Sequence, residues 1–224
     1  MRAIIVAHGQ PGDPGPQEQA LQVLAAQVAA CNPGCPVHGA TLAMPGALRV
    51  AEPGDLIYPM FMAEGWFTRS ELPRRLEQAG VRDVRILRPF GADAALPGLI
   101  RAIATRAAAE QGWTPRDTTL LLSAHGSQRS QASHDITQSL ARAVAPYFAH
   151  VVTGFVEQEP YVADAARDLG RAVHLPLFAL SAEHVTDDLP EALDAAGFDG
   201  VRLDPIGLAP ETPGLIATAI RGQR

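Results

Sequence analysis

The stretch TTLLLSAHG at residues 118–126 decides how this chain folds. Its continuous apolar run predicts a strand over 118–124 that is covered on both faces, as in a parallel sheet. A similar stretch, RAIIVAHG at residues 2–9, occurs near the start of the chain. The sequence therefore predicts two buried strands that each end in a histidine, His8 in the first half and His125 in the second.

One spacing relates segments of the first half of the chain to segments of the second half. His8 and His125 are 117 residues apart (125 − 8 = 117), and Pro59 of YPMF and Pro176 of LPLF have the same separation (176 − 59 = 117). The segments EGWFTRSELP at 64–73 and SAEHVTDDLP at 181–190 keep this offset. Chance recurrence would not hold one spacing over half a chain, so we expect an internal duplication with one lobe over 1–112 and another over 113–224.

Short apolar runs alternate with helix-like segments along both halves. Strands are expected over 2–7, 55–60, 84–87, 118–124, 150–155, 172–178 and 200–204. Helices are expected over 16–30, 69–80, 94–110, 131–146, 160–170, 186–197 and 211–221. This alternation predicts an α/β fold of two similar lobes, each a parallel β-sheet flanked by helices.

Length and composition narrow the range of partners. The 224 residues are 47% hydrophobic, which is enough for a sizeable core, and the net charge of −6 argues against nucleic acid as a partner. We find no signal-peptide pattern and no apolar run of membrane-spanning length, and therefore expect a cytoplasmic protein without membrane association.

The only cysteines, Cys31 and Cys35, flank a Pro-Gly turn and are expected to be a reduced pair.

Three polar side chains follow strands of the second half. His125 follows the strand at 118–124, Glu157 follows the strand at 150–155, and His184 ends the loop after the strand at 172–178. Since ligands bind beyond the carboxyl ends of parallel strands, we expect the three to meet at one sheet edge. Two imidazoles and a carboxylate suit a divalent transition metal, and they equally suit general base catalysis near neutral pH.

The first half keeps only part of this set. Matching GATLAMP at 39–45 to GFVEQEP at 154–160 places Leu42 opposite Glu157 and Met44 opposite Glu159, and the 117-residue offset places Phe67 opposite His184. Only His8 remains, and a single histidine after a strand is more often a structural hydrogen-bonding group. We therefore expect the polar site in the second half and an apolar wall in the first.

The segments SAHGS, FVEQEP and PLFALSAEHVTDDLP together resemble the CbiX-type sirohydrochlorin chelatases, which belong with the class II chelatases. The resemblance covers both halves and is strongest over 119–190. It implies a two-lobed α/β fold with the active site in a cleft between the lobes. It also implies insertion of cobalt or iron into sirohydrochlorin, in cobalamin or siroheme biosynthesis. One departure is Glu183, which stands where the family has a glycine before the histidine motif.

The resemblance also implies roles for particular residues. His125, His184 and Glu157 would bind the incoming divalent metal, Co²⁺ or Fe²⁺, and accept the pyrrole protons. Because sirohydrochlorin carries many carboxylates, residues that bind them are expected at the rim. The rim candidates are Ser127, Gln128, Arg129 and Arg69. No organic cofactor is expected, and the protein is expected to be a monomer or a weak homodimer.

Two other functions remain open from the sequence. A non-catalytic carrier of a tetrapyrrole or a metal would use the same cleft without accelerating insertion. A hydrolase that uses the Ala-His-Gly histidines is disfavoured, because phosphatases of that kind usually have an arginine just before the His-Gly pair. Ala7 and Ala124 stand there, and the chain has no Gly-x-Ser-x-Gly nucleophile motif.

Overall fold

The computed structural model describes residues 2–181 and 184–223, without the side chain of His184. The chain forms two compact units, one built from residues 1–93 and 210–224 and the other from residues 94–209. In the first unit, four parallel strands lie in the order β2-β1-β3-β4. Its strands are β1 (Ala3–Ala7), β2 (Val37–Thr41), β3 (Leu56–Pro59) and β4 (Arg85–Ile86), and its α-helices are α1 (Pro14–Ala30), α2 (Leu72–Gln78) and α7 (Thr212–Arg221).

The second unit repeats this plan, with four parallel strands in the order β6-β5-β7-β8. Its strands are β5 (Thr119–Ala124), β6 (His150–Phe155), β7 (Ala172–Pro176) and β8 (Val201–Arg202). Its α-helices are α3 (Leu96–Glu110), α4 (Ala132–Val144), α5 (Val162–Ala165) and α6 (Leu189–Ala195). The predicted fold class, two parallel sheets flanked by helices, is therefore confirmed.

Short helices of other types occur in both units, and the two π-helices lie at matching places. Two five-residue π-helices lead into α2 and α6, and they are η2 (Phe67–Glu71) and η6 (His184–Asp188). The 3-10 helices are η1 (Ala47–Val50), η3 (Phe90–Ala92), η4 (Pro115–Asp117), η5 (Ala145–Tyr147) and η7 (Ile206–Leu208). A π-helix is rare and often occurs at functional sites, so its repetition shows how closely the two halves match.

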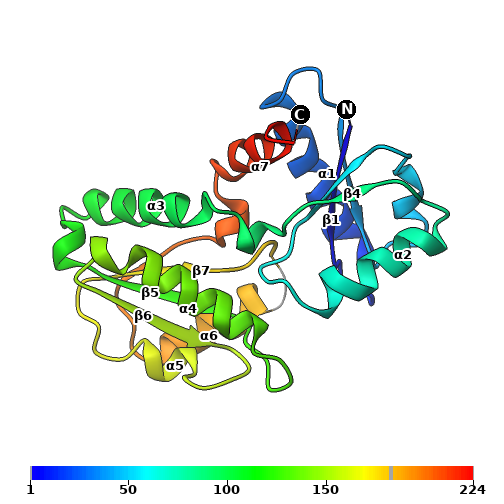
Figure 1. Cartoon of the computed structure of the whole chain (residues 1–224). Coiled ribbons are helices and arrows are strands. Elements are labelled where there is room, and N and C mark those ends of the chain that lie inside the picture. The colour runs from blue at the N-terminus through cyan, green and yellow to red at the C-terminus, as the bar shows by residue number, and fades with distance from the viewer. Residues whose placement is uncertain (1, 182–183, 224) are drawn as a thin grey trace. The chain divides into compact units, whose positions relative to one another are not determined.

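The compact units differ from the predicted lobes 1–112 and 113–224 by one helix each. Helix α3, which ends the first sequence repeat, packs against β7 and α4 in the second unit. Helix α7, which ends the second repeat, packs against α1 and β3 in the first unit, where Figure 1 shows it in red beside the blue α1. Each repeat therefore contributes its last helix to the unit formed by the other repeat.

Two elements differ from the sequence-based expectations. Strand β2 was not expected, because His38 and Gly39 interrupt its short apolar run. The helix expected over 160–170 is limited to the four residues of α5, and it is followed by Asp168 with φ 53° and Gly170 with φ 62°. Both backbones lie in the left-handed region, which ends a right-handed helix.

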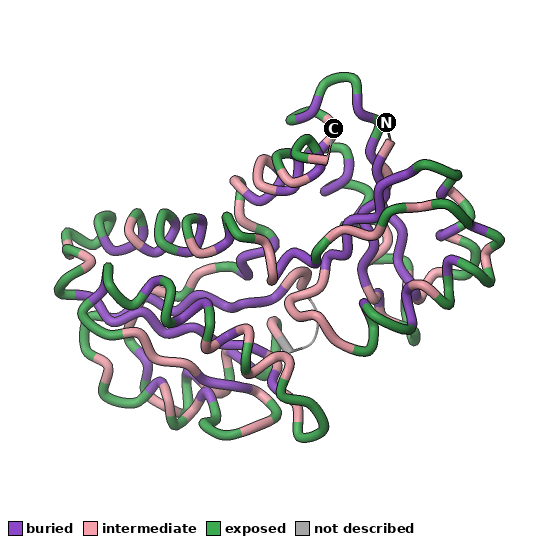
Figure 2. The backbone as a smooth tube through the Cα atoms, viewed as in Figure 1, coloured by how far each residue is buried: buried purple, intermediate pink, exposed green. Residues whose placement is uncertain are grey.

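The strands form the centre of each unit. Every residue of β1, β3, β5 and β7 is buried, and Figure 2 shows these strands in purple. Helices cover both faces of such a sheet, which explains why the strand sequences are almost wholly apolar. Among the described residues, no helix is both long enough and apolar enough to cross a membrane.

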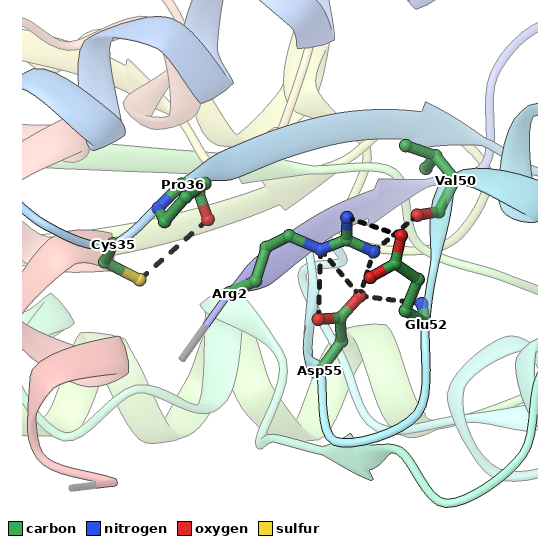
Figure 3. A network of polar contacts seen from close by, with 6 residues as sticks. All are labelled: Arg2, Cys35, Pro36, Val50, Glu52 and Asp55. Atoms are coloured by element: carbon green, nitrogen blue, oxygen red, sulfur yellow. Dashed lines mark hydrogen bonds and ion pairs between the residues drawn. The ribbon is translucent and has the colours of Figure 1, made fainter.

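A partly buried ion pair connects the start of β1 to the loop before β3 (Figure 3). The guanidinium of Arg2 donates to both carboxylate oxygens of Asp55, at 2.8 to 3.1 Å, and to the carbonyl of Val50 at 2.7 Å. The same Asp55 carboxylate accepts from the backbone N–H of Glu52 at 2.8 Å, and its side chain is only 6% exposed. Hydrogen bonds to Arg2 and to the backbone thus satisfy this buried carboxylate.

Replacing Arg2 with methionine is expected to lower the free energy of unfolding by about 3 kcal/mol. The substitution leaves the Asp55 carboxylate buried without its charged partner, which is the costly way to break such a pair. Urea unfolding followed by circular dichroism measures the loss. Arg69→Met serves as a control, because Arg69 forms its ion pair with Glu64 while 70% exposed, and exposed pairs contribute little. An equal loss in both variants would contradict a stabilising role for the ion pair between Arg2 and Asp55.

Candidate active site

The carboxyl edge of the second sheet brings His125 and Glu157 together. His125 directly follows β5, Glu157 lies two residues beyond β6, and the Glu157 N–H donates to the His125 carbonyl at 2.9 Å. Nδ1 of His125 lies 3.5 Å from Oε2 of Glu157, with the two side chains 43% and 47% exposed. The sheet thus places an imidazole and a carboxylate side by side, each accessible to a ligand.

The backbone around His125 fixes the tautomer of its ring. Nδ1 lies 3.1 Å from the carbonyl oxygen of Gly126, which can only accept a hydrogen bond. Nδ1 therefore carries the proton, and the nearby Glu157 carboxylate favours the same arrangement. The lone pair then resides on Nε2, as in metal-binding histidines that donate their other N–H to a carbonyl or a carboxylate.

The predicted third member, His184, begins the π-helix η6, but its side chain lies outside the described part of the structure. Within the described side chains, no group of three or more His, Cys, Asp and Glu is arranged to hold a metal ion. The structure therefore places two of the three predicted residues together, and the place of the third side chain stays a prediction.

A cavity of about 500 Å³ lies beside this pair. Its lining residues are Ser127, Gln128, Arg129, Val156, Glu157 and Tyr161. Three of the four rim candidates from the sequence thus share one cavity with the predicted catalytic carboxylate, and the fourth, Arg69, does not line it. Sequence reasoning missed Tyr161 and Val156, although both lie within six residues of Glu157, in the segment that follows β6.

The register of the sheets corrects one predicted correspondence between the halves. Ala7 pairs with Thr41, and its counterpart Ala124 pairs with Phe155. Counting onward from these pairs places Ala43, not Leu42, opposite Glu157. The backbone hydrogen bonds agree, because the Ala43 N–H donates to the His8 carbonyl at 2.9 Å just as the Glu157 N–H donates to the His125 carbonyl. The sequence match was one residue out of register, since it aligned two glycines that the sheets do not align.

The same shift moves Met44 from its predicted place opposite Glu159 to the place opposite Gln158. The conclusion drawn from the match still holds, because Ala43 is also apolar. The first unit has no carboxylate at the position that Glu157 occupies in the second unit.

An aromatic ring packs on His8, the counterpart of His125 in the first half. Phe67 meets His8 edge to face, with ring centroids 4.5 Å apart, and it also stacks on Phe61 at 6.1 Å and contacts Trp66 at 5.0 Å. Nδ1 of His8 donates to the Gly9 carbonyl at 2.6 Å. Phe67 begins η2 just as His184 begins η6, so the predicted correspondence of Phe67 and His184 is confirmed at the level of the backbone.

A second histidine of the second unit lies inside the sheet. His174, on β7, is 2% exposed, and its Nε2 lies 2.7 Å from Oγ of Ser123 on β5. Burial lowers the pKa of His174 to about 3, and the positive charge of Arg202 acts in the same direction. This residue is therefore a neutral core histidine, as expected of a histidine within an apolar strand.

The low pKa of His174 predicts an acid-sensitive fold. The unfolded chain binds a proton near pH 6.5 and the folded chain only near pH 3, so stability is complete above about pH 6.5 and is lost as the pH falls toward 3. Between pH 7 and pH 5 this residue should cost about 2 kcal/mol of unfolding free energy. Urea unfolding at both pH values should show that His174→Gln escapes this loss. An identical pH dependence in the variant would contradict the prediction.

Comparisons with known proteins agree with this fold. The CbiX family model matches residues 119–220. A solved structure described as CbiX, the terminal enzyme for biosynthesis of siroheme in denitrifying bacteria, is 56% identical with a TM-score of 0.95, and the match covers 100% of both chains. No curated protein gives a significant match.

Two structures of SirB share the fold at low identity. SirB from Bacillus subtilis with Fe³⁺ is 13% identical, with a TM-score of 0.76 over 98% of this chain and 94% of that chain. The sirohydrochlorin chelatase SirB from Bacillus subtilis subspecies spizizenii in complex with cobalt is 12% identical, with a TM-score of 0.65 over the same shares. The full-length identity of 56% to CbiX, together with the match to its family model, shows that this chain belongs to the CbiX family.

Proposed function

We propose that this protein inserts a divalent metal, cobalt or iron, into sirohydrochlorin, in siroheme or cobalamin biosynthesis. The observation that carries the proposal is the pair of His125 and Glu157 at the edge of the second sheet. It occurs in a chain that is 56% identical, over its whole length, to a terminal enzyme of siroheme biosynthesis. The enzyme is a lyase of the chelatase type. The metal ion and the tetrapyrrole are both substrates, and no organic cofactor takes part.

We propose a task for each residue of the pair, supported by the geometry. Nε2 of His125, which carries the lone pair, binds the incoming metal, and His184 supplies a second imidazole. Insertion releases two N–H protons from the macrocycle, so the reaction needs a base that accepts them. Glu157 lies on the Nδ1 side of His125, and this position supports a role as proton acceptor and as the group that orients the imidazole.

The cavity beside Glu157 suits a polycarboxylate substrate. Arg129 supplies a guanidinium, which binds carboxylates through paired hydrogen bonds, and Ser127 and Gln128 add neutral polar groups. We propose that one acetate or propionate arm of the macrocycle enters this cavity. Arg69 on η2 remains a further candidate for a carboxylate arm. We also place the enzyme in the cytoplasm as a monomer or a weak homodimer.

A steady-state assay with purified sirohydrochlorin tests the proposal. The absorbance of the free macrocycle should disappear in proportion to enzyme concentration when cobalt or iron is supplied, and nickel gives the comparison that ranks the metals. A carrier protein would bind the macrocycle tightly and leave the rate at the level of spontaneous insertion. That result would refute the proposed activity.

A further inference from the structure

The loop that follows β5 is held by side chains as well as by the sheet. The N–H of Gly126 donates to Oγ of Ser133 at 3.2 Å, and the N–H of Ser127 donates to Oε1 of Gln158 at 2.7 Å. Gln158 also packs over Gly126, where an added Cβ would lie 2.7 Å from its Cγ, and Gly126 has φ 76°. The loop is thus fixed in a conformation that favours glycine.

The Gly126–Ser127 peptide links Gln158 to His125. Its N–H donates to Gln158, while its C=O accepts from Nδ1 of His125 at 3.1 Å. Because a peptide unit is planar, fixing its N–H also fixes the direction of its C=O. Hydrogen bonds in such a chain polarise one another, so the bond that the Ser127 N–H donates to Gln158 strengthens the bond that the Gly126 C=O accepts from the imidazole.

The first unit provides an internal comparison. The sheet register places Met44 at the position of Gln158, and the thioether of methionine is only a weak acceptor. Helix α1 begins with Pro14, Gly15 and Pro16, none of which has a hydroxyl to match Ser133. The polar support thus belongs to the half that carries the proposed site, and the other half, where Phe67 packs on His8, has different residues at both places.

We propose that Gln158 is a positioning residue for His125. His8 forms the same hydrogen bond from Nδ1 to a carbonyl, at 2.6 Å, without such support, so the tautomer itself does not need Gln158. Gln158 instead sets the direction of the Gly126 carbonyl through the Gly126–Ser127 peptide, and so keeps the imidazole turned with the lone pair of Nε2 toward the incoming metal. Gln158 itself touches neither the metal nor the reacting atoms. This inference rests on the proposed function only in that Nε2 of His125 is the metal-binding atom.

Cobalt binding without any tetrapyrrole tests the inference. Gln158→Met installs the residue of the first unit, keeps the size of the side chain and removes the acceptor. It should weaken Co²⁺ affinity, measured by d–d absorption, by roughly tenfold to a hundredfold. Gln158→Glu keeps an acceptor oxygen and should retain most of the affinity. Met44→Gln, a matched change in the first unit, should bind Co²⁺ like the unaltered protein. Unchanged Co²⁺ affinity in Gln158→Met would overturn the inference.

A second readout stays informative even if Gln158→Met fails to fold or the proposed function fails. Long-range ¹H–¹⁵N correlation spectra of the unaltered protein report the tautomer of His125. The inference requires a protonated Nδ1 in the metal-free protein, and a protonated Nε2 would overturn it. If the tautomer is as expected but neither Co²⁺ binding nor metal insertion occurs, the proposed function fails while the assignment of the proton to Nδ1 of His125 stands.

Discussion

His125→Ala is expected to lower turnover of metal insertion by a factor of about 10² to 10⁴, the range typical of losing a positioned acid–base group. The substitution removes the imidazole that binds the metal through Nε2, and it leaves Glu157 without the ring that it orients. His184→Ala is expected to cause a similar, near-complete loss. The measurement is the steady-state rate of insertion at saturating metal and sirohydrochlorin.

The first half of the chain supplies the matched control for this result. His8 follows β1 as His125 follows β5, and His8→Ala removes an imidazole of equal size from a unit without the carboxylate partner. We expect this variant to keep most of its turnover. If His8→Ala abolished turnover while His125→Ala left it intact, the active histidine would lie in the first half.

Gly207→Ala is expected to destabilise the fold by about 3 kcal/mol or more, because overpacking against backbone atoms cannot be relieved by a side-chain rotation. A Cβ at residue 207 would lie 1.9 Å from the carbonyl oxygen of Ala179, and the Gly207 N–H donates to the Phe178 carbonyl at 3.0 Å. Alanine must therefore push η7 away from the segment that follows β7. That segment leads to His184, so turnover should fall together with stability.

A glycine in open space provides the control. Gly98 lies in α3, where an added Cβ would meet no atom within 4 Å, so Gly98→Ala should be neutral or stabilising by up to about 1 kcal/mol. Urea unfolding midpoints of the two variants measure the difference. The close contact recurs in the first unit, where a Cβ on Gly91 would lie 1.7 Å from the carbonyl oxygen of Met62. A Gly207→Ala protein as stable as Gly98→Ala would contradict this account.

The sequence predicted the features that local pattern and internal repetition encode. The apolar strands gave the two parallel sheets, and the 117-residue offset led to the correspondence of Phe67 with His184 that the two π-helices confirm. It did not predict β2, whose apolar run is interrupted, or the exchange of α3 and α7. The periodicity of a helix indicates which face is buried, but it carries no information on which sheet will cover that face.

The proposed site was predictable to a similar extent. Strand ends placed His125 and Glu157 at one edge, because the carboxyl ends of parallel strands converge there. The role of Gln158 was not predictable, since it depends on one peptide whose N–H and C=O point to two different side chains. Only the positive φ of Gly126 and the sheet register bring these groups together.

A crystal structure of the protein with cobalt would show whether the metal binds at the carboxyl edge of the second sheet. Anomalous scattering at the cobalt edge locates the ion without any assumption about the reaction. We expect a cobalt ion bound to Nε2 of His125 at about 2.1 Å, the usual distance from an imidazole nitrogen to a divalent transition metal. A cobalt ion bound at His8 instead, with none at His125, would contradict this expectation.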